Sequence, residues 1–282
     1  MKTKQHLIAL DLDGTLLTAD KKISQTNLNI IRKAINNGHI VVIATGRPHR
    51  SSIDYYQTLK LDTPMVNFNG ALIHHPADAK WHTLHNPMPV RSAQHIIEAC
   101  YNLGVRNIVA EVMDSVYIDQ YDEQMMELFQ NSDQNTLFTI GSLKNKLQTD
   151  PTSLLIHPHA DNADQLRSHL DHYHAELIEH RKWGLPWNII EIVKKGLNKA
   201  IGLQKVAYYY HIPKERIIAF GDEDNDLEMI DYAGVGVAMG NAIDELKTVS
   251  KYITDTNEMD GIGHFLNDYL NLHYHDVKTD NL

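Results

Sequence analysis

The chain has 282 residues, enough for a large hydrophobic core and for one or two domains. Its 26 basic and 36 acidic residues give a formal net charge of −10, which argues against a broad nucleic-acid-binding face because such a face needs clustered Lys and Arg. Cys100 is the only cysteine, so an intramolecular disulfide is excluded. The apolar run before Asp11 is too short for a signal peptide, and no stretch is long and apolar enough to span a membrane. We therefore expect a cytoplasmic protein.

The first third of the chain alternates predicted strands and helices. Residues 7–10, LIAL, form a continuous apolar run that is typical of a strand buried on both faces. Residues 24–38 predict a helix that Ser24 caps and Gly38 ends. Next come a second apolar strand at 39–46, a helix at 48–60 that starts with Pro48, and a strand at 64–70 with a turn at Asn69–Gly70. This alternation indicates a parallel sheet covered on both faces.

The pattern changes near residue 85. The sequence predicts helices near 91–102, 122–130 and 162–174, and strands near 107–113, 115–120 and 153–158. Two further strands, 175–180 and 187–193, face each other across the short connection RKWGLP, which favours an antiparallel sheet. Residues 130–151 give no clear pattern. We interpret 85–189 as a separate α+β module.

The alternating pattern resumes after this module. It predicts helices at 197–210, 225–234 and 243–250, and strands at 216–222, 235–239 and 251–254. One domain interrupted by an insertion explains this order better than three domains in a row. We therefore predict an α/β fold with a doubly wound, Rossmann-like core of residues 1–84 and 190–282, and an inserted α+β domain of residues 85–189.

Four polar segments end or follow predicted strands of this core: DLDGT at 11–15, ATGR at 44–47, GLNKA at 196–200 and GDEDND at 221–226. Sites in open parallel sheets form outside the carboxyl ends of the strands, so the four segments are expected to meet in one crevice. They contribute six acids: Asp11, Asp13, Asp222, Glu223, Asp224 and Asp226. Such crowding is costly without a cation, and oxygen ligands without Cys or His favour Mg²⁺.

Thr45 and Lys199 add a hydroxyl donor and a positive charge, which suit the oxygens of a phosphate. The pattern therefore indicates phosphoryl transfer. Asp11 is the candidate nucleophile, because an aspartate can attack phosphorus and form an aspartyl-phosphate. Asp13 can protonate the leaving alcohol and later deprotonate the attacking water, which explains why the loop holds two acids.

These segments resemble the four motifs of the haloacid dehalogenase superfamily of phosphohydrolases. More narrowly, LIALDLDGTLL, VVIATGR, EIVKKGLNKAIGL and GDEDNDLEMI resemble its Cof-type, class IIB subfamily. The resemblance covers nearly all of 5–270, although inside 85–189 it depends on the order of elements more than on motifs. It implies that 85–189 forms a cap domain of the C2B type over a catalytic core.

The resemblance also implies roles for individual residues. Asp11 would be nucleophile and metal ligand, Asp13 general acid/base and metal ligand through its backbone carbonyl, and Asp222 a metal ligand. Phosphate would be bound by Thr45, Lys199, Asn225 and the backbone N–H groups of Leu12 and Gly46. Asp226 would support the site by orienting Lys199 or a metal-bound water. Glu223 would be a further metal ligand or merely solvated. Other possible supporting residues near the substrate are Arg47, Asn69 and Gly70. Arg47 is equally well explained as a surface residue, and Asn69–Gly70 as a simple turn.

The function that these features predict is a Mg²⁺-dependent phosphatase acting on a small phosphorylated metabolite: a sugar phosphate, a nucleotide or a phosphorylated cofactor. One alternative is a phosphotransferase such as a sugar phosphomutase, which would protect the same aspartyl-phosphate from water. Another is a non-catalytic phosphate-binding regulatory protein. A dehalogenase needs no second aspartate, so Asp13 argues against that activity. No nucleic-acid or membrane partner is predicted, and the sequence does not indicate an oligomeric state.

Overall fold

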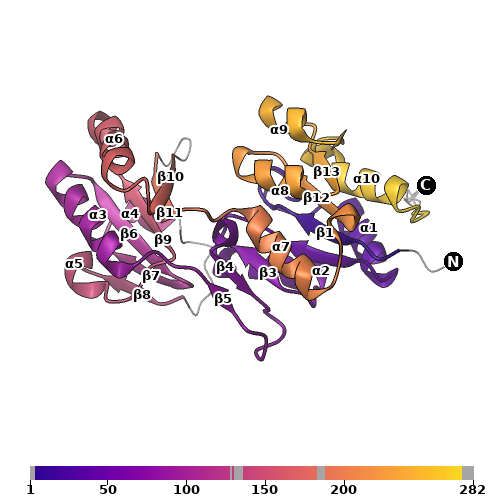
Figure 1. The fold of residues 1–282 in the computed structure, drawn as a ribbon, viewed down its shortest axis with the longest axis horizontal. Coiled ribbons are helices and arrows are strands. Elements are labelled where there is room, and N and C mark those ends of the chain that lie inside the picture. The colour runs from indigo at the N-terminus through magenta and orange to yellow at the C-terminus, as the bar shows by residue number, and fades with distance from the viewer. Residues whose placement is uncertain (1–3, 128, 130–135, 183–187, 275–282) are drawn as a thin grey trace, which may run out of the picture. The chain divides into compact units, whose positions relative to one another are not determined.

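The computed structural model describes residues 4–127, 129, 136–182 and 188–274, and the fold is drawn in Figure 1. The chain divides into two compact units. The first comprises Met1–Gly46, Ile53–Thr83 and Asn198–Leu282, and the second comprises Arg47–Ser52 and Leu84–Leu197. Most of the predicted RKWGLP connection lies outside the described residues. None of the helices within these ranges is long and apolar enough to cross a membrane.

The first unit contains a five-stranded parallel sheet in the order β14-β13-β12-β1-β2. Its strands are β1 (Leu7–Leu10), β2 (Ile40–Ile43), β12 (Ile217–Gly221), β13 (Val235–Ala238) and β14 (Tyr252–Ile253). All residues of the first four strands are buried, because helices cover both faces of the sheet. The sequence predicted each of these five strands, and the doubly wound, Rossmann-like α/β core is confirmed.

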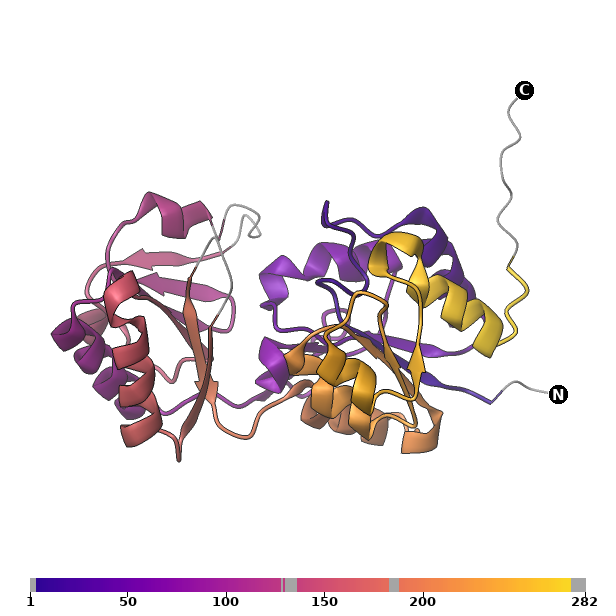
Figure 2. The same ribbon diagram turned by 90° about the horizontal axis from the view of Figure 1, so that it is seen from above.

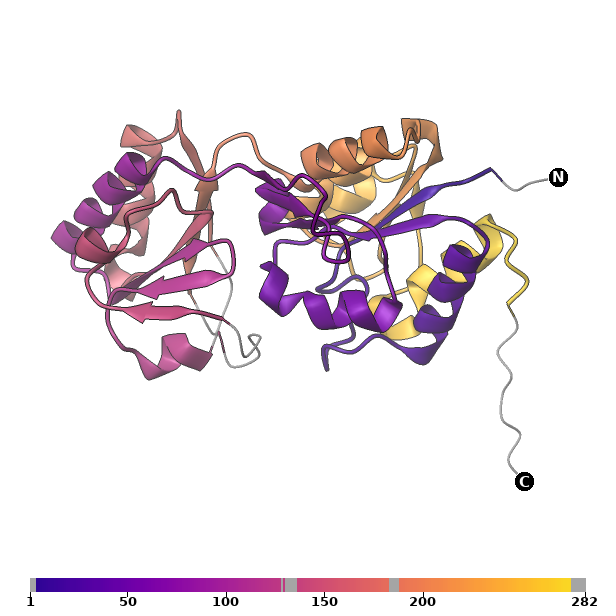
Figure 3. The ribbon, with the colours of Figure 1, turned by 90° about the horizontal axis from the view of Figure 1, so that it is seen from below.

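Helices lie on both faces of this sheet. Figures 2 and 3 show α1 (Gln25–Asn36) and α10 (Gly261–Tyr269) together on one face, and α7 (Lys199–Tyr209) and α8 (Leu227–Tyr232) on the other. The short helix α9 (Asp244–Val249) packs against α8. The Ser24 hydroxyl accepts a hydrogen bond from the Asn27 N–H, so the predicted N-cap of α1 is confirmed. The sequence did not predict α10.

The segment after β2 differs from the prediction in two places. The helix expected at 48–60 is interrupted: a 3₁₀ turn, η1 (His49–Ser51), precedes α2 (Ile53–Leu59). The Ser52 hydroxyl donates to the Pro48 carbonyl, which closes that turn before α2 starts. The strand expected at 64–70 is short, β3 (Met65–Asn67), and it pairs antiparallel with β4 (Leu72–His74) across η2 (Phe68–Gly70). An isolated parallel bridge, Ala44 to Val66, links it to the end of β2.

The second unit is built on a six-stranded sheet in the order β10-β11-β9-β6-β7-β8. Its strands are β6 (Asn107–Val112), β7 (Ser115–Ile118), β8 (Phe138–Ile140), β9 (Ser153–His157), β10 (Ile178–Lys182) and β11 (Ile190–Lys194), and the short strand β5 (Leu84–His85) precedes them in the chain. All neighbours are antiparallel except β7 and β8. The predicted pairing of the two strands on either side of RKWGLP is therefore confirmed.

One face of this second sheet carries the unit's larger hydrophobic core. Figure 3 shows α3 (Val90–Leu103) and α6 (Ala163–Tyr173) side by side against that face, and the core between them includes Ile97, Cys100, Leu166 and Leu170. The helix α5 (Leu143–Lys146) completes it. A smaller cluster around Val109 and Leu155 lies on the opposite face, with α4 (Glu123–Glu127).

Candidate active site

Two aspartates stand at the carboxyl ends of neighbouring parallel strands. Asp11 follows β1 and Asp222 follows β12, and both side chains are buried. Asp226 is fully buried in the 3₁₀ turn η5 (Asp224–Asp226) that comes after Asp222. One carboxylate oxygen from each of Asp11, Asp222 and Asp226 lies within 4.8 Å of the other two. The sheet topology thus brings together acids that are more than 200 positions apart in the sequence.

A buried lysine holds two of these acids. Lys199 is the first residue of α7 and is completely buried, and its Nζ donates to Asp11 Oδ1 and to Asp226 Oδ1, each at 2.7 Å. Burial alone would lower the pKa of the lysine, but the two carboxylates outweigh it and raise that pKa, so the ammonium keeps its proton. The Asn198 side chain accepts from the Ile201 N–H at 3.0 Å and caps α7, which fixes where Lys199 enters the cluster.

The second oxygen of Asp226 is held by the backbone. Its Oδ2 accepts from the N–H of Asp222 at 3.0 Å and from the N–H of Glu223 at 3.3 Å. In return the Glu223 side chain accepts from the Asp226 N–H, so the two residues form a capping box around η5. Asp226 is therefore a rigid support for Lys199. Glu223 is exposed, and its carboxylate is used as a cap rather than as part of the buried acid cluster.

Asp222 is oriented by the loop that follows β1. The Thr15 hydroxyl donates to Asp222 Oδ1 at 2.8 Å. Gly14 has a φ of 72°, and a Cβ at that position would lie 2.0 Å from Asp222 Oδ2, so only glycine fits. Burial is the main cause that raises the pKa of Asp222 to about 7. Burial likewise raises the pKa of Asp11, because Lys199 only partly offsets it and the charges of Asp226 and Asp222 add to it.

Asp13 occupies a different environment from Asp11. Its side chain is 44% exposed, and its Oδ1 lies 2.6 Å from the Nζ of Lys21, which donates a hydrogen bond to it. Lys21 has a left-handed backbone conformation with a φ of 58°, and its carbonyl accepts from the Tyr55 hydroxyl. The sequence did not predict this pair. The only signal for it is a lysine in the turn that follows DLDGTLL, and a turn lysine is most often simply solvated.

The predicted phosphate-binding residues of the second motif lie beside η2. Thr45 is buried, its N–H donates to the Val66 carbonyl at 2.9 Å, and its carbonyl accepts from the Asn69 N–H at 3.1 Å. Asn225 Nδ2 donates to Asn69 Oδ1 at 3.1 Å. The structure therefore brings Thr45, Asn69 and Asn225 together in the first unit.

The glycines and Leu12 are constrained by their surroundings. Gly70 has a φ of 95°, and a Cβ there would lie 2.4 Å from the Asn198 carbonyl oxygen, beside the cap of α7. A Cβ at Gly46 would approach the Asn69 amide at 3.3 Å. The Leu12 side chain is fully buried, so only its backbone could contact a ligand. Arg47 belongs to the second unit, where its Nη1 donates to the Ser51 carbonyl at 3.2 Å.

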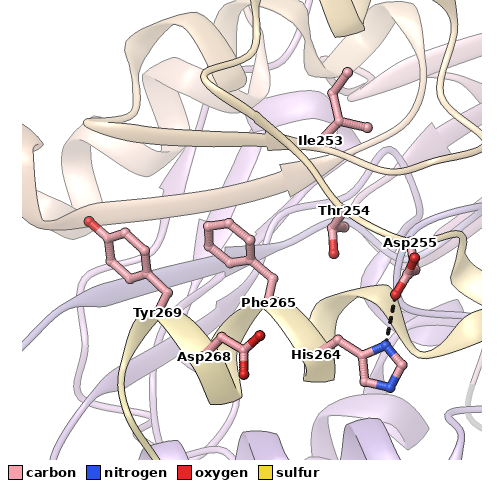
Figure 4. A pocket seen from close by; sticks show the side chains of 7 residues that line it. All are labelled: Ile253, Thr254, Asp255, His264, Phe265, Asp268 and Tyr269. Carbon is pink, nitrogen blue, oxygen red and sulfur yellow. Dashed lines mark hydrogen bonds and ion pairs between the residues drawn. The ribbon is translucent and has the colours of Figure 1, made fainter.

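A separate surface hollow of about 500 Å³ lies in the first unit, where β14 and the chain after it meet α10 (Figure 4). It is lined by Ile253, Thr254, Asp255, His264, Phe265, Asp268 and Tyr269. Asp255 Oδ2 and His264 Nδ1 are 2.8 Å apart there. None of the predicted site residues lines this hollow, so the candidate active site is the Asp–Lys cluster, which consists of Asp11, Lys199, Asp222 and Asp226.

This fold and this cluster define a hydrolase of the haloacid dehalogenase type. The family of haloacid dehalogenase-like hydrolases matches residues 8–266, and the chain belongs to it. Within the family it is a Cof-type member, as the motifs indicated. It is a phosphatase that acts on phosphorylated small molecules.

Three relatives show how far the similarity extends. The chain is 50% identical over 272 residues to the 5-amino-6-(5-phospho-D-ribitylamino)uracil phosphatase YitU of Bacillus subtilis, covering 96% of this chain and all of that protein. It is 30% identical to the pyridoxal phosphate phosphatase YbhA of Escherichia coli, covering 94% and 98%. The crystal structure of TM0651 from Thermotoga maritima has a TM-score of 0.82 and 28% identity, covering 94% and 97%.

Proposed function

We propose that this phosphatase hydrolyses 5-amino-6-(5-phospho-D-ribitylamino)uracil, the substrate named for its 50% identical relative, through a covalent phosphate on Asp11. The observation that carries the catalytic part of the proposal is the geometry of Lys199. Its Nζ bonds Asp11 and Asp226 at 2.7 Å each, so a buried carboxylate is held in one orientation beside a permanent positive charge. That arrangement suits attack on a phosphate dianion, which a carboxylate would otherwise repel.

The donor set fits Mg²⁺. Three carboxylates with oxygens within 4.8 Å of one another are crowded, and burial raises the pKa values of Asp11 and Asp222, so a hard cation would relieve both effects. Asp11, Asp222 and the backbone carbonyl of Asp13 would hold the ion. When bound, it would neutralise charge on the phosphoryl oxygens as a Lewis acid. Asp226 would not be a direct ligand, because Lys199 and two backbone N–H groups already occupy its oxygens.

The chain's own residues supply the rest of the reaction. An oxygen of Asp11 attacks phosphorus, the bond from phosphorus to the ester oxygen breaks, and Asp13 gives its proton to the departing alkoxide. Asp13 then takes a proton from water, the water oxygen attacks phosphorus, and the bond to Asp11 breaks, which releases inorganic phosphate. The 44% exposure of Asp13, against the burial of Asp11, suits a group that must exchange protons with a leaving alcohol and with water.

A substrate panel tests the proposed substrate. Phosphate release is measured for the ribitylaminouracil phosphate, pyridoxal phosphate, several sugar phosphates and p-nitrophenyl phosphate, with Mg²⁺ and with EDTA. We expect the highest kcat/KM for the ribitylaminouracil phosphate and no turnover in EDTA. A higher kcat/KM for pyridoxal phosphate, the substrate named for the 30% identical relative, would contradict the proposed substrate while leaving the mechanism intact.

An Asp13→Asn variant tests the covalent step. The p-nitrophenolate of p-nitrophenyl phosphate leaves without a proton, so this variant should still phosphorylate Asp11, whereas hydrolysis of the phosphoenzyme should slow by roughly 10²–10⁴-fold. We expect a burst of p-nitrophenolate equal to the enzyme concentration, and a phosphoprotein that hydroxylamine cleaves. If the protein were a phosphomutase, the wild type would itself retain the phosphoenzyme. If it were a non-catalytic binding protein, neither the wild type nor Asp13→Asn would show a burst.

A further inference from the structure

An ion pair is buried inside the second unit. Arg50 lies in η1, and its Nη2 donates to Oε1 of Glu111 in β6. Only 3% of the Arg50 side chain and 5% of the Glu111 side chain are exposed. Glu111 Oε2 also accepts from the Ser153 hydroxyl of β9 at 2.7 Å. Burying two charges seldom stabilises a protein more than apolar residues would, so such a pair is better explained by a role in positioning.

The turn that carries Arg50 is attached to the second unit at more than one point. The Arg50 backbone N–H donates to Asp114 Oδ1 at 3.1 Å, and the guanidinium carbon lies 5.4 Å from the centre of the Phe129 ring. Two other guanidinium nitrogens of Arg50, Nε and Nη1, are buried without an acceptor among the described residues. A contact selected for stability alone would avoid that cost, because buried polar groups are normally paired.

The turn is also closed on itself. The Ser52 hydroxyl donates to the Pro48 carbonyl at 2.8 Å, and Arg47 Nη1 donates to the Ser51 carbonyl at 3.2 Å. Residues 47–52 therefore hold together as one turn, and they group with the second unit although residues 46 and 53 belong to the first. These two hydrogen bonds link the part of the turn that carries Arg50 to Arg47 at its start.

The turn directly follows Thr45 and Gly46 of the first unit, which are predicted to bind phosphate. Thr45 is held there by hydrogen bonds to Val66 and Asn69, and Gly46 is the only residue between Thr45 and Arg47. We propose that Arg50 is a positioning residue: its pairing with Glu111 fixes the turn 47–52 and thereby sets the adjoining Gly46 peptide, whose N–H would bind the substrate phosphate. This inference goes beyond the proposed function and assumes that the loop at Thr45 and Gly46 binds phosphate in that reaction.

A double variant removes the charges with little change in shape. In Arg50→Met with Glu111→Gln, the glutamine still offers an oxygen to Ser153, and no buried charge is left alone. The matched control is Lys144→Met with Glu98→Gln, which removes an exposed pair of the same unit whose atoms are 3.8 Å apart. Four quantities are measured for each protein: the KM for p-nitrophenyl phosphate, the inhibition constant of inorganic phosphate, the activation constant of Mg²⁺ and the thermal midpoint.

We expect the KM and the phosphate inhibition constant to rise about tenfold in the Arg50–Glu111 variant, because small displacements of binding groups have effects of that order. The Mg²⁺ constant should stay within about twofold of the unchanged protein, because none of the proposed metal ligands lies in the turn. The control should change neither. An unchanged phosphate constant would overturn the proposal, as would a parallel loss of phosphate binding, Mg²⁺ activation and thermal midpoint, which is the signature of general destabilisation.

Two further measurements cover other outcomes. If the double variant does not fold, Arg50→Lys keeps the charge but loses the forked donor, and the same selective rise in the phosphate constant is expected. Hydrogen exchange of the peptide spanning 47–52 needs no activity: exchange there should accelerate in the Arg50–Glu111 variant and not in the control. Unchanged exchange there would refute the proposal that the Arg50–Glu111 pair fixes the turn. Absence of turnover in the unchanged protein would instead refute the proposed function.

Discussion

The substitution Asp222→Asn should stabilise the metal-free protein at neutral and alkaline pH. Asp222 is 7% exposed, and its pKa is raised to about 7 because it is buried and because Asp226 lies beside it. Asparagine removes the charge and keeps an oxygen that can accept the Thr15 hydroxyl, which now donates to Asp222 Oδ1 at 2.8 Å. The variant therefore loses the unfavourable ionisation without losing the hydrogen bond.

The sign and size of this gain in stability follow from the linkage between protonation of Asp222 and folding. A carboxyl whose pKa is higher in the folded state contributes stability that is complete below the unfolded pKa near 4 and is lost as pH rises through the folded pKa of about 7. Between pH 5 and pH 7 the loss is about 1.36 kcal/mol per pH unit, or ~3 kcal/mol in all. We therefore expect Asp222→Asn to gain about 3 kcal/mol relative to the unchanged protein between pH 5 and pH 8.

Urea unfolding in EDTA at pH 5 and pH 8 measures this difference. Asp231→Asn, at an exposed position of α8, is the matched control and should follow the unchanged protein at both pH values. Adding Mg²⁺ at pH 8 should stabilise the unchanged protein and the control but not Asp222→Asn, because the proposed metal site exists only in the folded state and includes Asp222. Equal pH dependence in Asp222→Asn and the unchanged protein would refute the reasoning.

Three further predictions concern the same cluster. Asp11→Asn should leave the circular dichroism spectrum unchanged and reduce p-nitrophenolate release to below a few percent, and a higher residual rate would exclude Asp11 as the nucleophile. Chelation by EDTA should stop turnover and Mg²⁺ should restore it, whereas full activity without metal would contradict the assignment of the acids. Gly14→Ala should weaken Mg²⁺ activation and lower stability by well over 1 kcal/mol, because its Cβ would lie 2.0 Å from Asp222 Oδ2. Gly38→Ala, with a φ of 90° and nothing within 4 Å, is its control, and an equal loss there would show that only backbone strain matters.

The sheet of the first unit was predictable because its signal is local. Runs such as Leu7–Leu10 and Ile217–Gly221 are apolar at every position, which only a strand buried on both faces allows. Polar residues directly after these runs then predict a site at the carboxyl edge. The third predicted strand shows the limit. Met65–Asn67 is equally buried, but the left-handed residues Phe68 and Asn69 turn the chain back, and β3 pairs antiparallel with β4.

Contacts between distant residues had no comparable signal. Arg50 and Glu111 are 61 positions apart, and a charged residue is normally exposed, so neither position suggests a buried pair. Thr15 and Asp222 are 207 positions apart, and the threonine alone indicates only a turn. The helix α10 was missed although Ile262, Phe265, Leu266 and Tyr269 have helical spacing, because Gly261 and Gly263 disrupt the pattern at its start.

The charges of the cluster give one reason why it would be retained despite its effect on stability. Asp11, Asp222 and Asp226 carry three negative charges when ionised, and Lys199 supplies one positive charge, so two negative charges remain uncompensated in a buried volume. Replacing one acid by an amide would reduce the repulsion between these charges. It would also remove one of the two uncompensated negative charges that a bound divalent cation would neutralise. The same uncompensated charge that opposes folding in the absence of metal would favour Mg²⁺ binding in its presence. Stability of the metal-free state and affinity for the cation should therefore change in opposite directions when the carboxylate removed is that of Asp222, because Asp222 is not one of the two acids that bond Lys199.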